Sequence, residues 1–410
     1  MKESIKKRIK AVRRGEVPEG YVSQNHQLRP VDWKYEKIGK YLVPYDEFSN
    51  DTKAYPLATS SRQGLMLQSE YYIDQRYEET TGGFHVVPVG YVTYRHMSDD
   101  DIFRFNLNKI GQPVLVSPEY PVFTTTWGLN QDLLVAYLNE MKEFQAFCSA
   151  QKKGSTRTRM YFRRLCEFTI PIPSITEQQK IAEILATCDR MIELKQSKID
   201  ELKKLKQVCL LEMFPQKGQT IPKRRFPGFS APWEQREVQD VADRFDNLRI
   251  PVAANLRVHG TTPYYGANGI QDYVEGFTHD GEFVLVAEDG ANDLKNYPVK
   301  CVNGRIWVNN HAHVLQGKTG IANNSFLAFV INQSDIESLL VGGGRAKLNA
   351  ETLMSIEFRM PCLQEQYRIG EYLTQLDNLI TLHQRELAET GKYKKALMQL
   401  LLTGLVRVNA

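Results

Sequence analysis

The densest group of hydrogen-bonding side chains in strand-type sequence lies in the second half of the chain and consists of Asn309, Asn310, His311 and His313. An Asn side chain can hydrogen-bond to both N6 and N7 of adenine, so a member of this group could read a base in DNA. Two histidines separated by one residue on a strand could instead bind a metal ion. Because no cysteine lies close in sequence and the carboxylates are distant, we favour a base contact or a polar turn beneath a sheet, and we predict no metal site.

Further candidates for DNA contacts are loops that combine donors with glycine or with other donors. Tyr264, Tyr265 and Asn268 lie in a loop with two glycines, where the backbone can approach a phosphate closely. In the first half, Arg62 could bind guanine or phosphate, and Gln63 could read adenine. A turn or a solvated surface explains each group about as well. The candidates of the first half are Ser60, Ser61, Arg62, Gln63, Gln68, Tyr94, Arg95 and His96.

Basic residues also follow a glycine at equivalent places in the two halves. Arg157 and Arg159 follow one glycine, and Arg345 and Lys347 follow the other. This duplication indicates phosphate clamps that act without sequence preference. The net charge of the whole chain is only +4, although seven basic side chains stand against one acidic side chain in the segment 1–14. Charge alone therefore leaves nucleic-acid binding open against a solvated surface.

The chain lacks the motifs of enzymes that act on DNA. It has no Pro-Pro dipeptide, hence no N-P-P-Y or D-P-P-Y methyltransferase motif, and no G-x-x-x-x-G-K-[ST] phosphate loop. The pairs Glu193/Lys195 and Glu201/Lys203 match the end of a nuclease motif, but side chains at i and i+2 on a helix do not face each other. We therefore predict no catalytic residue and no cofactor in this chain.

Length and composition indicate an ordinary globular protein. A chain of 410 residues suggests two to four domains. No apolar run approaches the length of a membrane span, and no apolar run follows the basic start as it would in a secretory signal. The six cysteines form no C-x-x-C pair, which indicates reduced thiols in a cytoplasmic protein.

The elements that must position these residues repeat within the chain. The stretch that starts at Glu177 aligns without a gap with the stretch that starts at Glu365. Apolar residues recur in both copies at alternate spacings of four and three, the heptad pattern of packed helices. No proline interrupts residues 177–214 or 365–402, so each helix would run for 38 residues, about 57 Å at ~1.5 Å per residue. The predicted helix seam consists of Ile181, Leu185, Ile192, Ile369, Leu373 and Ile380.

Short β-type runs with turn residues fill the blocks outside these helices. We predict an α+β fold in which two mixed α/β domains are separated by two long antiparallel helices that form an intramolecular coiled coil with pseudo-two-fold symmetry. A dimerisation coiled coil is the alternative for the helices. The predicted boundaries are 1–30 for a basic N-terminal segment, 31–166 for the first globule, 167–216 for a helical spacer, 217–356 for a linker with the second globule, and 357–410 for the second helical region.

The chain resembles the specificity (S) subunits of type I restriction–modification systems. Both helices open with P-x(n)-E-Q-x-x-I-x-x-x-L, from Pro173 to Leu185 and from Pro361 to Leu373, and RFPGF precedes Trp233. LATSSRQGLMLQSEYY in the first globule and PYYGANGI in the second are similar to segments of the target-recognition domains of this family. The likeness covers the chain after about residue 30, and residues 1–14 could form an N-terminal helix beside the C-terminal one.

The resemblance implies a non-catalytic chain that reads a bipartite, asymmetric site in double-stranded DNA with two unlike recognition domains. The two half-sites would lie about one helical turn apart, roughly 34 Å. Two modification (M) subunits would dock on the helices and methylate adenine with S-adenosylmethionine. Restriction (R) subunits would add cleavage that depends on ATP and Mg. No membrane partner is expected. The alternative from another class is a coiled-coil scaffold that binds no DNA.

Overall fold

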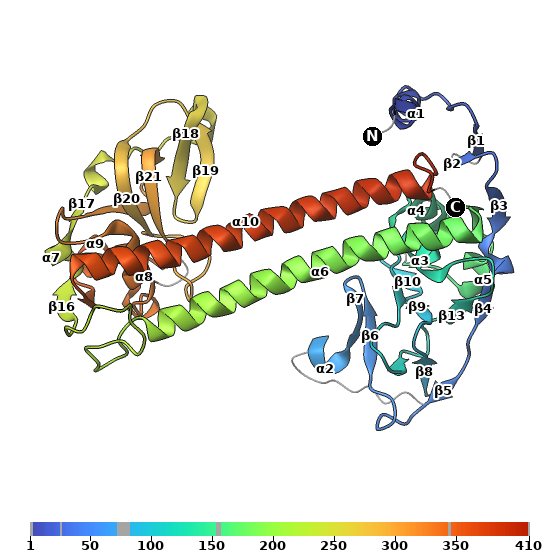
Figure 1. Ribbon diagram of the computed structural model, residues 1–410, viewed down its shortest axis with the longest axis horizontal. Coiled ribbons are helices and arrows are strands. Elements are labelled where there is room, and N and C mark those ends of the chain that lie inside the picture. Colours follow the sequence, from blue (N-terminus) through green and yellow to red (C-terminus); the bar gives the residue numbers. More distant parts are fainter. Residues whose placement is uncertain (1–2, 25–26, 72–82, 153–156, 343–345, 409–410) are drawn as a thin grey trace. The chain divides into compact units, whose positions relative to one another are not determined.

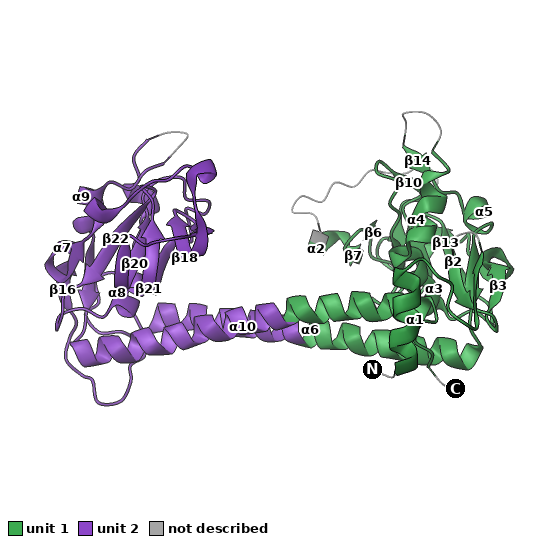
Figure 2. Cartoon of the chain, turned by 90° about the horizontal axis from the view of Figure 1, so that it is seen from above, with its two compact units in different colours: residues 1–194, 387–410 green, residues 195–386 purple. Residues whose placement is uncertain are grey.

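The chain divides into two compact units (Figure 2). Unit 1 comprises residues 1–194 and 387–410, and unit 2 comprises residues 195–386. The structure is a computed structural model that describes residues 3–24, 27–71, 83–152, 157–342 and 346–408.

Two long helices, α6 (Ile175–Glu212) and α10 (Leu363–Leu402), each contribute residues to both units (Figure 2). Both begin two residues before the start predicted from the heptad pattern. The predicted helical regions at 167–216 and 357–410 nevertheless open with strands, because residues 169–172 and 357–360 each pair with another strand. Among the described residues, no helix is both long enough and apolar enough to cross a membrane.

Unit 1 consists of short strands and helices around the first part of α6 and the last part of α10. In chain order, these elements are α1 (Glu3–Arg13), β1 (Tyr21–Gln24), β2 (Gln27–Pro30), β3 (Lys34–Lys37), η1 (Ile38–Lys40), β4 (Leu42–Pro44), β5 (Phe48–Ser49), β6 (Ala58–Ser61), β7 (Gly64–Leu67), α2 (Gln68–Tyr71), β8 (Phe84–Val87), β9 (Val92–Tyr94), β10 (Met97–Ser98), β11 (Phe105–Leu107), β12 (Val114–Val116), β13 (Val122–Thr125), α3 (Gln131–Glu140), α4 (Lys142–Ser149), β14 (Thr158–Arg159), α5 (Phe162–Leu165) and β15 (Thr169–Ile172).

Two small antiparallel sheets form the centre of unit 1. One has the strand order β11-β9-β13-β4 and the other β12-β8-β5, while β6 and β7 form a separate hairpin. Branched and aromatic side chains of the first sheet pack against α3 and α4, as such residues do on a half-buried pleated surface. The same cluster contains Ile181 and Leu185 of α6 and Met398 and Leu401 of α10. The helices are therefore part of the core of unit 1.

Unit 2 contains one larger sheet of six strands in the order β17-β22-β20-β21-β18-β19, antiparallel except for the pair of β18 and β21. Helix α8 lies beneath this sheet (Figure 1), in contact with β20 and β21, and most of its apolar side chains are buried. In chain order, the elements are β16 (Glu234–Glu237), α7 (Val238–Val241), β17 (Ala242–Arg244), η2 (Asp246–Leu248), η3 (Ala254–Leu256), β18 (His259–Gly266), β19 (Gly269–Val274), β20 (His279–Ala287), β21 (Val299–Val308), β22 (Ala312–Gly317), α8 (Asn324–Asn332), η4 (Glu337–Leu339), α9 (Ala350–Met354) and β23 (Glu357–Met360).

The two long helices pair antiparallel within each unit. In unit 1, Lys394 forms an ion pair with Asp189, and in unit 2 the Nζ of Lys206 lies 2.6 Å from Oδ1 of Asp377. These ion pairs match in the repeat, because Asp189 aligns with Asp377 and Lys206 with Lys394. Of the predicted seam, Ile192 is half-buried. The other five are buried: Ile181, Leu185, Ile369, Leu373 and Ile380.

A glutamine near the start of each long helix fixes the loop that leads into a short helix of the same unit. In unit 1, Oε1 of Gln178 accepts a hydrogen bond from the backbone N–H of Asn130 at 2.7 Å, and Nε2 donates to the carbonyls of Gly128 and Pro173. The side chain of Asn130 in turn caps α3 by accepting from the N–H of Leu133.

The same set of bonds occurs in unit 2. Oε1 of Gln366 accepts from the N–H of Asn323 at 3.0 Å, and Nε2 donates to the carbonyls of Ile321 and Pro361. The side chain of Asn323 caps α8 through the N–H of Phe326. The sequence repeat therefore corresponds to a repeated hydrogen-bonding frame.

The glutamate before each glutamine is also buried, but its partners differ between the units. Glu177 accepts from Nε1 of Trp33 at 3.1 Å, from two nitrogens of Arg407 and from the N–H of Val408. Glu365 is bound by Arg225 through two hydrogen bonds of 2.8 and 2.6 Å. The indole N–H of Trp233, which opens the second half as Trp33 opens the first, has no hydrogen-bond partner among the described residues.

Candidate nucleic-acid interface

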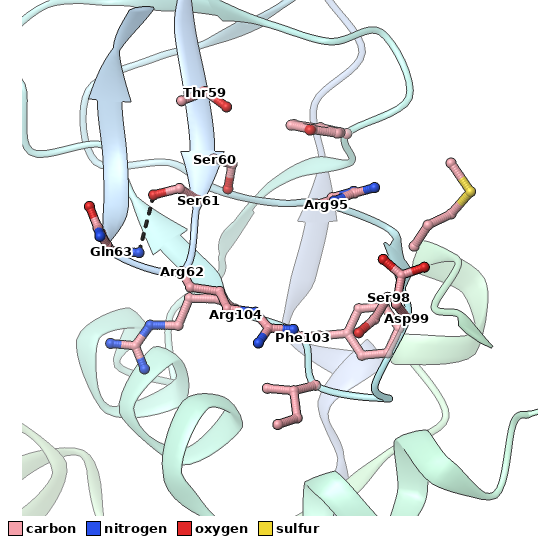
Figure 3. A pocket seen from close by; sticks show the side chains of 13 residues that line it. Thr59, Ser60, Ser61, Arg62, Gln63, Arg95, Ser98, Asp99, Phe103 and Arg104 are labelled. Carbon is pink, nitrogen blue, oxygen red and sulfur yellow. Dashed lines mark hydrogen bonds between the residues drawn. The ribbon is translucent and has the colours of Figure 1, made fainter. Parts of the chain in front are cut away.

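A polar pocket of about 330 Å³ in unit 1 brings together five of the residues predicted to contact DNA (Figure 3). The β6–β7 hairpin forms one wall and the segment from residue 95 to 104 forms another. Three arginines and one aspartate, Asp99, line the pocket, so its wall is net positive and offers hydrogen-bond donors to an anionic ligand. The predicted residues in its wall are Ser60, Ser61, Arg62, Gln63 and Arg95.

A buried asparagine holds the hairpin in place. The Nδ2 of Asn106 donates to Oγ of Ser60 and to the carbonyl of Ser61, each at 2.8 Å. The Oγ of Ser61 accepts from the N–H of Gln63 and donates to the carbonyl of Gly64, which closes the turn. Arg62 and Gln63 are consequently exposed at the tip of an ordered turn. Sequence reasoning missed Asn106, because one asparagine within a strand gives no pattern.

An acidic segment, Asp99–Asp101, pairs with two of the predicted phosphate-binding residues. Arg62 lies 2.5 Å from Asp100, and Arg157 lies 2.6 Å from Asp99. The hydrogen bond from Arg62 holds the pKa of Asp100 below its usual range. Both ion pairs are exposed, so each contributes little to stability. A DNA phosphate could replace these carboxylates, and the run of three aspartates in the sequence was the available signal.

Other predicted residues of unit 1 are not in the pocket wall. Arg159 is exposed on β14, and Gln68 is half-buried at the start of α2. The prediction for Tyr94 is wrong, because the side chain is fully buried and its hydroxyl donates to the carbonyl of Met160. Burial raises the pKa of Tyr94 well above its usual value. His96 is also buried, and its ring stacks on Tyr161.

In unit 2, the two predicted tyrosines belong to the protein interior. Tyr264 is 1% exposed, and its hydroxyl bonds to the backbone of Val252 beneath the guanidinium of Arg257. Tyr265 packs in the core of the sheet. The predicted DNA contacts of these two side chains are therefore wrong. Asn268 is exposed and links its loop to the next one through bonds to Gly290 and Asn292.

The predicted Asn and His residues of unit 2 separate into buried and exposed members. Asn309 is buried and accepts a hydrogen bond from the N–H of His311. The His311 ring is half-exposed, with Nδ1 2.6 Å from Oδ1 of Asp289. Asn310 is exposed, whereas His313 is 1% exposed and so is unavailable to DNA, against the prediction. Arg345 lies outside the described residues.

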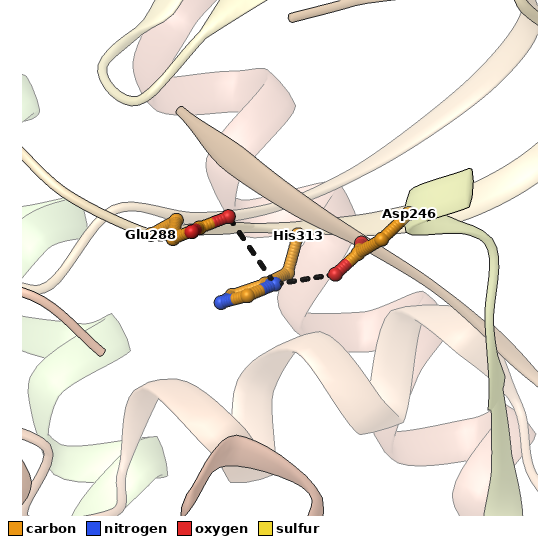
Figure 4. A group of neighbouring side chains, drawn as sticks. All are labelled: Asp246, Glu288 and His313. Atoms are coloured by element: carbon orange, nitrogen blue, oxygen red, sulfur yellow. Dashed lines mark hydrogen bonds and ion pairs between the residues drawn. The ribbon is translucent and has the colours of Figure 1, made fainter. Parts of the chain in front are cut away.

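His313 instead joins two carboxylates under the sheet edge (Figure 4). Its Nδ1 lies 2.7 Å from Asp246 and 3.7 Å from Glu288, while Nε2 lies 2.9 Å from the carbonyl of Leu348. Both ring nitrogens thus lie within hydrogen-bond distance of an oxygen atom. Lys347 lies 2.8 Å from Glu288 on its other side.

These charges fix the segment that carries Lys347 to the sheet. Burial would raise the pKa of Glu288, but hydrogen bonds from Lys347 and Arg249 outweigh it and hold the pKa below its usual range. Burial likewise opposes the hydrogen bond from His313 at Asp246, whose pKa is also lowered. A metal ion here would have to displace these cationic partners, so the group fits an internal ion network better than a metal site.

Comparison with known proteins identifies the family of both units. Residues 106–204 and 231–390 match the family model described as type I restriction modification DNA specificity domain. The chain is 42% identical over 162 residues to a putative type I restriction enzyme specificity subunit of Haemophilus influenzae, which covers 40% of this chain and 41% of that protein. It is 23% identical over 312 residues to the MjaVIII specificity subunit of Methanocaldococcus jannaschii, covering 68% of this chain and 71% of that protein.

The fold is similar to one already solved. The crystal structure of a type I restriction–modification system S subunit from M. genitalium superposes with a TM-score of 0.64 at 14% identity. The match covers 93% of this chain and 99% of that one. The predicted fold, with mixed α/β domains and two long antiparallel helices, is therefore confirmed.

Proposed function

Because the chain belongs to the family of type I restriction modification DNA specificity domains, we propose that it is the specificity subunit of such a system. In this role it selects the DNA sequence and has no catalytic group of its own. The observation that carries the proposal is the frame repeated at Gln178 and Gln366, on which two units with different polar surfaces are built. A repeated frame with unlike surfaces suits two unlike DNA half-sites.

Each unit would read one half of a bipartite site in double-stranded DNA. In unit 1 the groups available to base edges are Gln63 and Arg95, with Arg62 beside them. In unit 2 they are Asn310 and His311. Arginine pairs best with guanine, and asparagine or glutamine with adenine. Because the side chains differ between the units, the two halves of the target should differ as well.

The helices carry a duplicated apolar surface that suits a partner present in two copies. Unit 1 exposes Met191, Leu194 and Tyr393 by 48%, 64% and 73%. Exposed apolar groups of this size on helix faces mark protein contact sites. In the alignment of the repeat, the matching side chains are exposed in unit 2 by 43%, 50% and 39%: Leu379, Leu382 and Leu205.

We assign these two surfaces to two modification subunits. Those subunits would supply adenine methylation with S-adenosylmethionine, and restriction subunits would supply cleavage that depends on ATP and Mg. A methyltransferase must take its target adenine out of the stack, so the specificity subunit's part is to place the duplex. The complex would act in the cytoplasm, where the six cysteines would stay reduced.

The test is a base-resolution map of methylated adenine in the source cell with and without this gene. We expect deletion to remove one split, asymmetric motif. Loss of the motif together with binding of the purified chain to that motif supports the proposal. An unchanged map, combined with no DNA binding by the purified chain, overturns it and leaves the coiled-coil scaffold.

Paired variants sharpen the same test. Gln63→Ala with Arg95→Ala should relax one half of the motif only, and Asn310→Ala with His311→Ala should relax the other half only. Lys392→Ala, an exposed change on α10, is the control and should leave the motif unchanged. A pair of variants that relaxes both halves, or neither, contradicts the assignment of one half-site to each unit.

A further inference from the structure

The N-terminal helix α1 lies in a segment that carries more positive charge than the whole chain. The segment 1–14 has a net charge of +6, with seven basic side chains and one acidic one, against +4 for the complete sequence. The rest of the chain is therefore slightly negative. A protein that binds a polyanion needs basic side chains that can release counterions from the phosphates.

Helix α1 is held to unit 1 by one face. Ile5, Ile9 and Val12 follow each other at helical spacing on this face, and all three are half-buried. Beside them, Arg8 donates to the hydroxyl of Tyr21 at 2.7 Å, and this hydroxyl donates to the carbonyl of Gly404 at 2.6 Å. These two hydrogen bonds tie α1 to β1 and to the segment that follows α10.

The opposite face of α1 is a basic stripe formed by Lys6, Lys7, Lys10 and Arg13. All four side chains are exposed. Lys6 lies 3.5 Å from Glu3, and the other three have no carboxylate partner among the described residues. Two basic residues near the pocket of unit 1 differ, because Arg62 and Arg157 are already paired with aspartates (2.5 and 2.6 Å).

We propose that the basic stripe of α1 binds the DNA backbone without sequence preference, separately from the surfaces that read bases. This inference rests on the proposed function. The stripe adds a sequence-independent electrostatic contribution to the affinity. Because three of the four cations have no carboxylate partner among the described residues and lie on an anchored helix, binding phosphates breaks few existing ion pairs and orders few additional residues.

The experiment compares the full-length chain with the variant Lys7→Gln/Lys10→Gln/Arg13→Gln. Glutamine is a good helix former, so α1 keeps its conformation. Binding is measured between about 50 and 200 mM salt on two duplexes of equal length, one with the mapped motif and one with it scrambled. Each lost phosphate contact should reduce the slope of log K against log[salt] by about 0.9, so we expect a slope shallower by roughly 2–3.

The affinity should fall by the same factor on both duplexes, leaving the preference for the motif unchanged. The matched control, Lys7→Arg/Lys10→Arg/Arg13→Lys, keeps the charge and should keep the original slope. An unchanged slope in the glutamine variant overturns the inference. If that slope is unchanged and the variant instead fails to co-purify with its partner subunits, α1 binds an acidic protein surface and the inference is wrong.

The outcome for α1 can be distinguished from that of the proposed function. If the unmodified chain binds the motif and the scrambled duplex equally, sequence reading fails whatever α1 does. If the unmodified chain prefers the motif while the glutamine variant has an unchanged slope, only the role of α1 fails.

Discussion

Glu177 and Glu365 occupy matching positions in the first turns of α6 and α10, yet different segments bind them. Glu177 is held by a tryptophan, by the backbone and by Arg407, which follows α10. Glu365 is held by Arg225, which follows α6. The segment after one long helix thus supplies the cation for the other helix. The comparison teaches that the buried glutamate is repeated in both units, whereas the groups that donate hydrogen bonds to it are not. The same substitution should therefore change the stability of the two units by different amounts.

The largest difference is expected for the two arginines. Arg225→Ala leaves Glu365, which is 0% exposed, without any described cationic partner and should cost about 3–5 kcal/mol in the stability of unit 2. Arg407→Ala should cost only about 1–2 kcal/mol, because Glu177 keeps its bonds to Trp33 and Val408. Urea unfolding of the full-length chain, with amide hydrogen exchange to assign each unit, measures both. Equal losses of stability would show that the hydrogen bonds that Trp33 and Val408 donate to Glu177 have no energetic effect.

A control variant separates the cost of leaving the Glu365 carboxylate unpaired from the contribution of the Arg225–Glu365 ion pair to stability. The double variant Arg225→Met/Glu365→Leu replaces both partners by apolar groups and should recover much of the loss, since apolar replacements of buried ion pairs are often neutral. A double variant as unstable as Arg225→Ala alone would mean that the ion pair itself holds the linker.

The two glutamines should respond equally. Gln178→Ala and Gln366→Ala each remove three hydrogen bonds, one of them buried and two part-buried, and should each cost about 2–3 kcal/mol in the stability of the affected unit. The same unfolding and exchange measurements apply. A loss in one unit only would contradict the equivalence of the frame. Gln375→Ala, an exposed change on α10, should have almost no effect.

The two tryptophans should again respond unequally, by a smaller amount. Trp33→Phe removes the 3.1 Å hydrogen bond to Glu177, whereas Trp233→Phe removes an N–H that has no described partner. Since both replacements leave similar cavities, the difference between the two losses of stability measures one hydrogen bond to a charged group. We expect this difference to be about 1.5–3 kcal/mol, or about 1 kcal/mol if Arg407 moves to compensate for the lost bond. Thermal unfolding of each variant measures it, and a larger loss for Trp233→Phe would reverse the comparison.

The smallest effect is a pH dependence of unit 2. Burial lowers the pKa of His279 below its usual value of 6.5, and its ring bonds to Thr278 and to the carbonyl of Phe245. As the pH falls, His279 is protonated in the unfolded chain before it is protonated in the folded one. The contribution of the neutral side chain to the stability of unit 2 is therefore complete above pH 6.5 and is lost as the pH falls toward the lowered pKa. Hydrogen exchange of unit 2 across this range should show the loss, and His279→Gln should flatten it. If the stability of the His279→Gln variant depends on pH in the same way, the pH dependence comes from other groups.

The long helices were predictable because their pattern is local and repeated. Heptad spacing without proline placed both starts within two residues, and the aligned Gln178 and Gln366 were visible as part of the repeat. Burial in the two domains was not predictable in the same way. Tyr94 and Tyr264 lie in polar sequence, but strand pairing with distant segments buries them. The pocket was foreseen as a donor-rich run, whereas the carboxylates of Asp99 and Asp100 opposite it depend on tertiary contacts.

The division of the chain into units sets an order of events during synthesis. Unit 2 is one continuous stretch, residues 195–386, whereas the core of unit 1 needs Met398 and Leu401 from the end of α10. On a ribosome, unit 2 has all its residues while Ile181 and Leu185 still lack the α10 members of their cluster, Met398 and Leu401. At ~5–20 residues per second, the interval between the synthesis of Leu185 and that of Met398 lasts about 10–40 s. The first half of the protein is therefore the last to be completed, and its apolar helix face must be kept from aggregation until the C-terminal residues arrive.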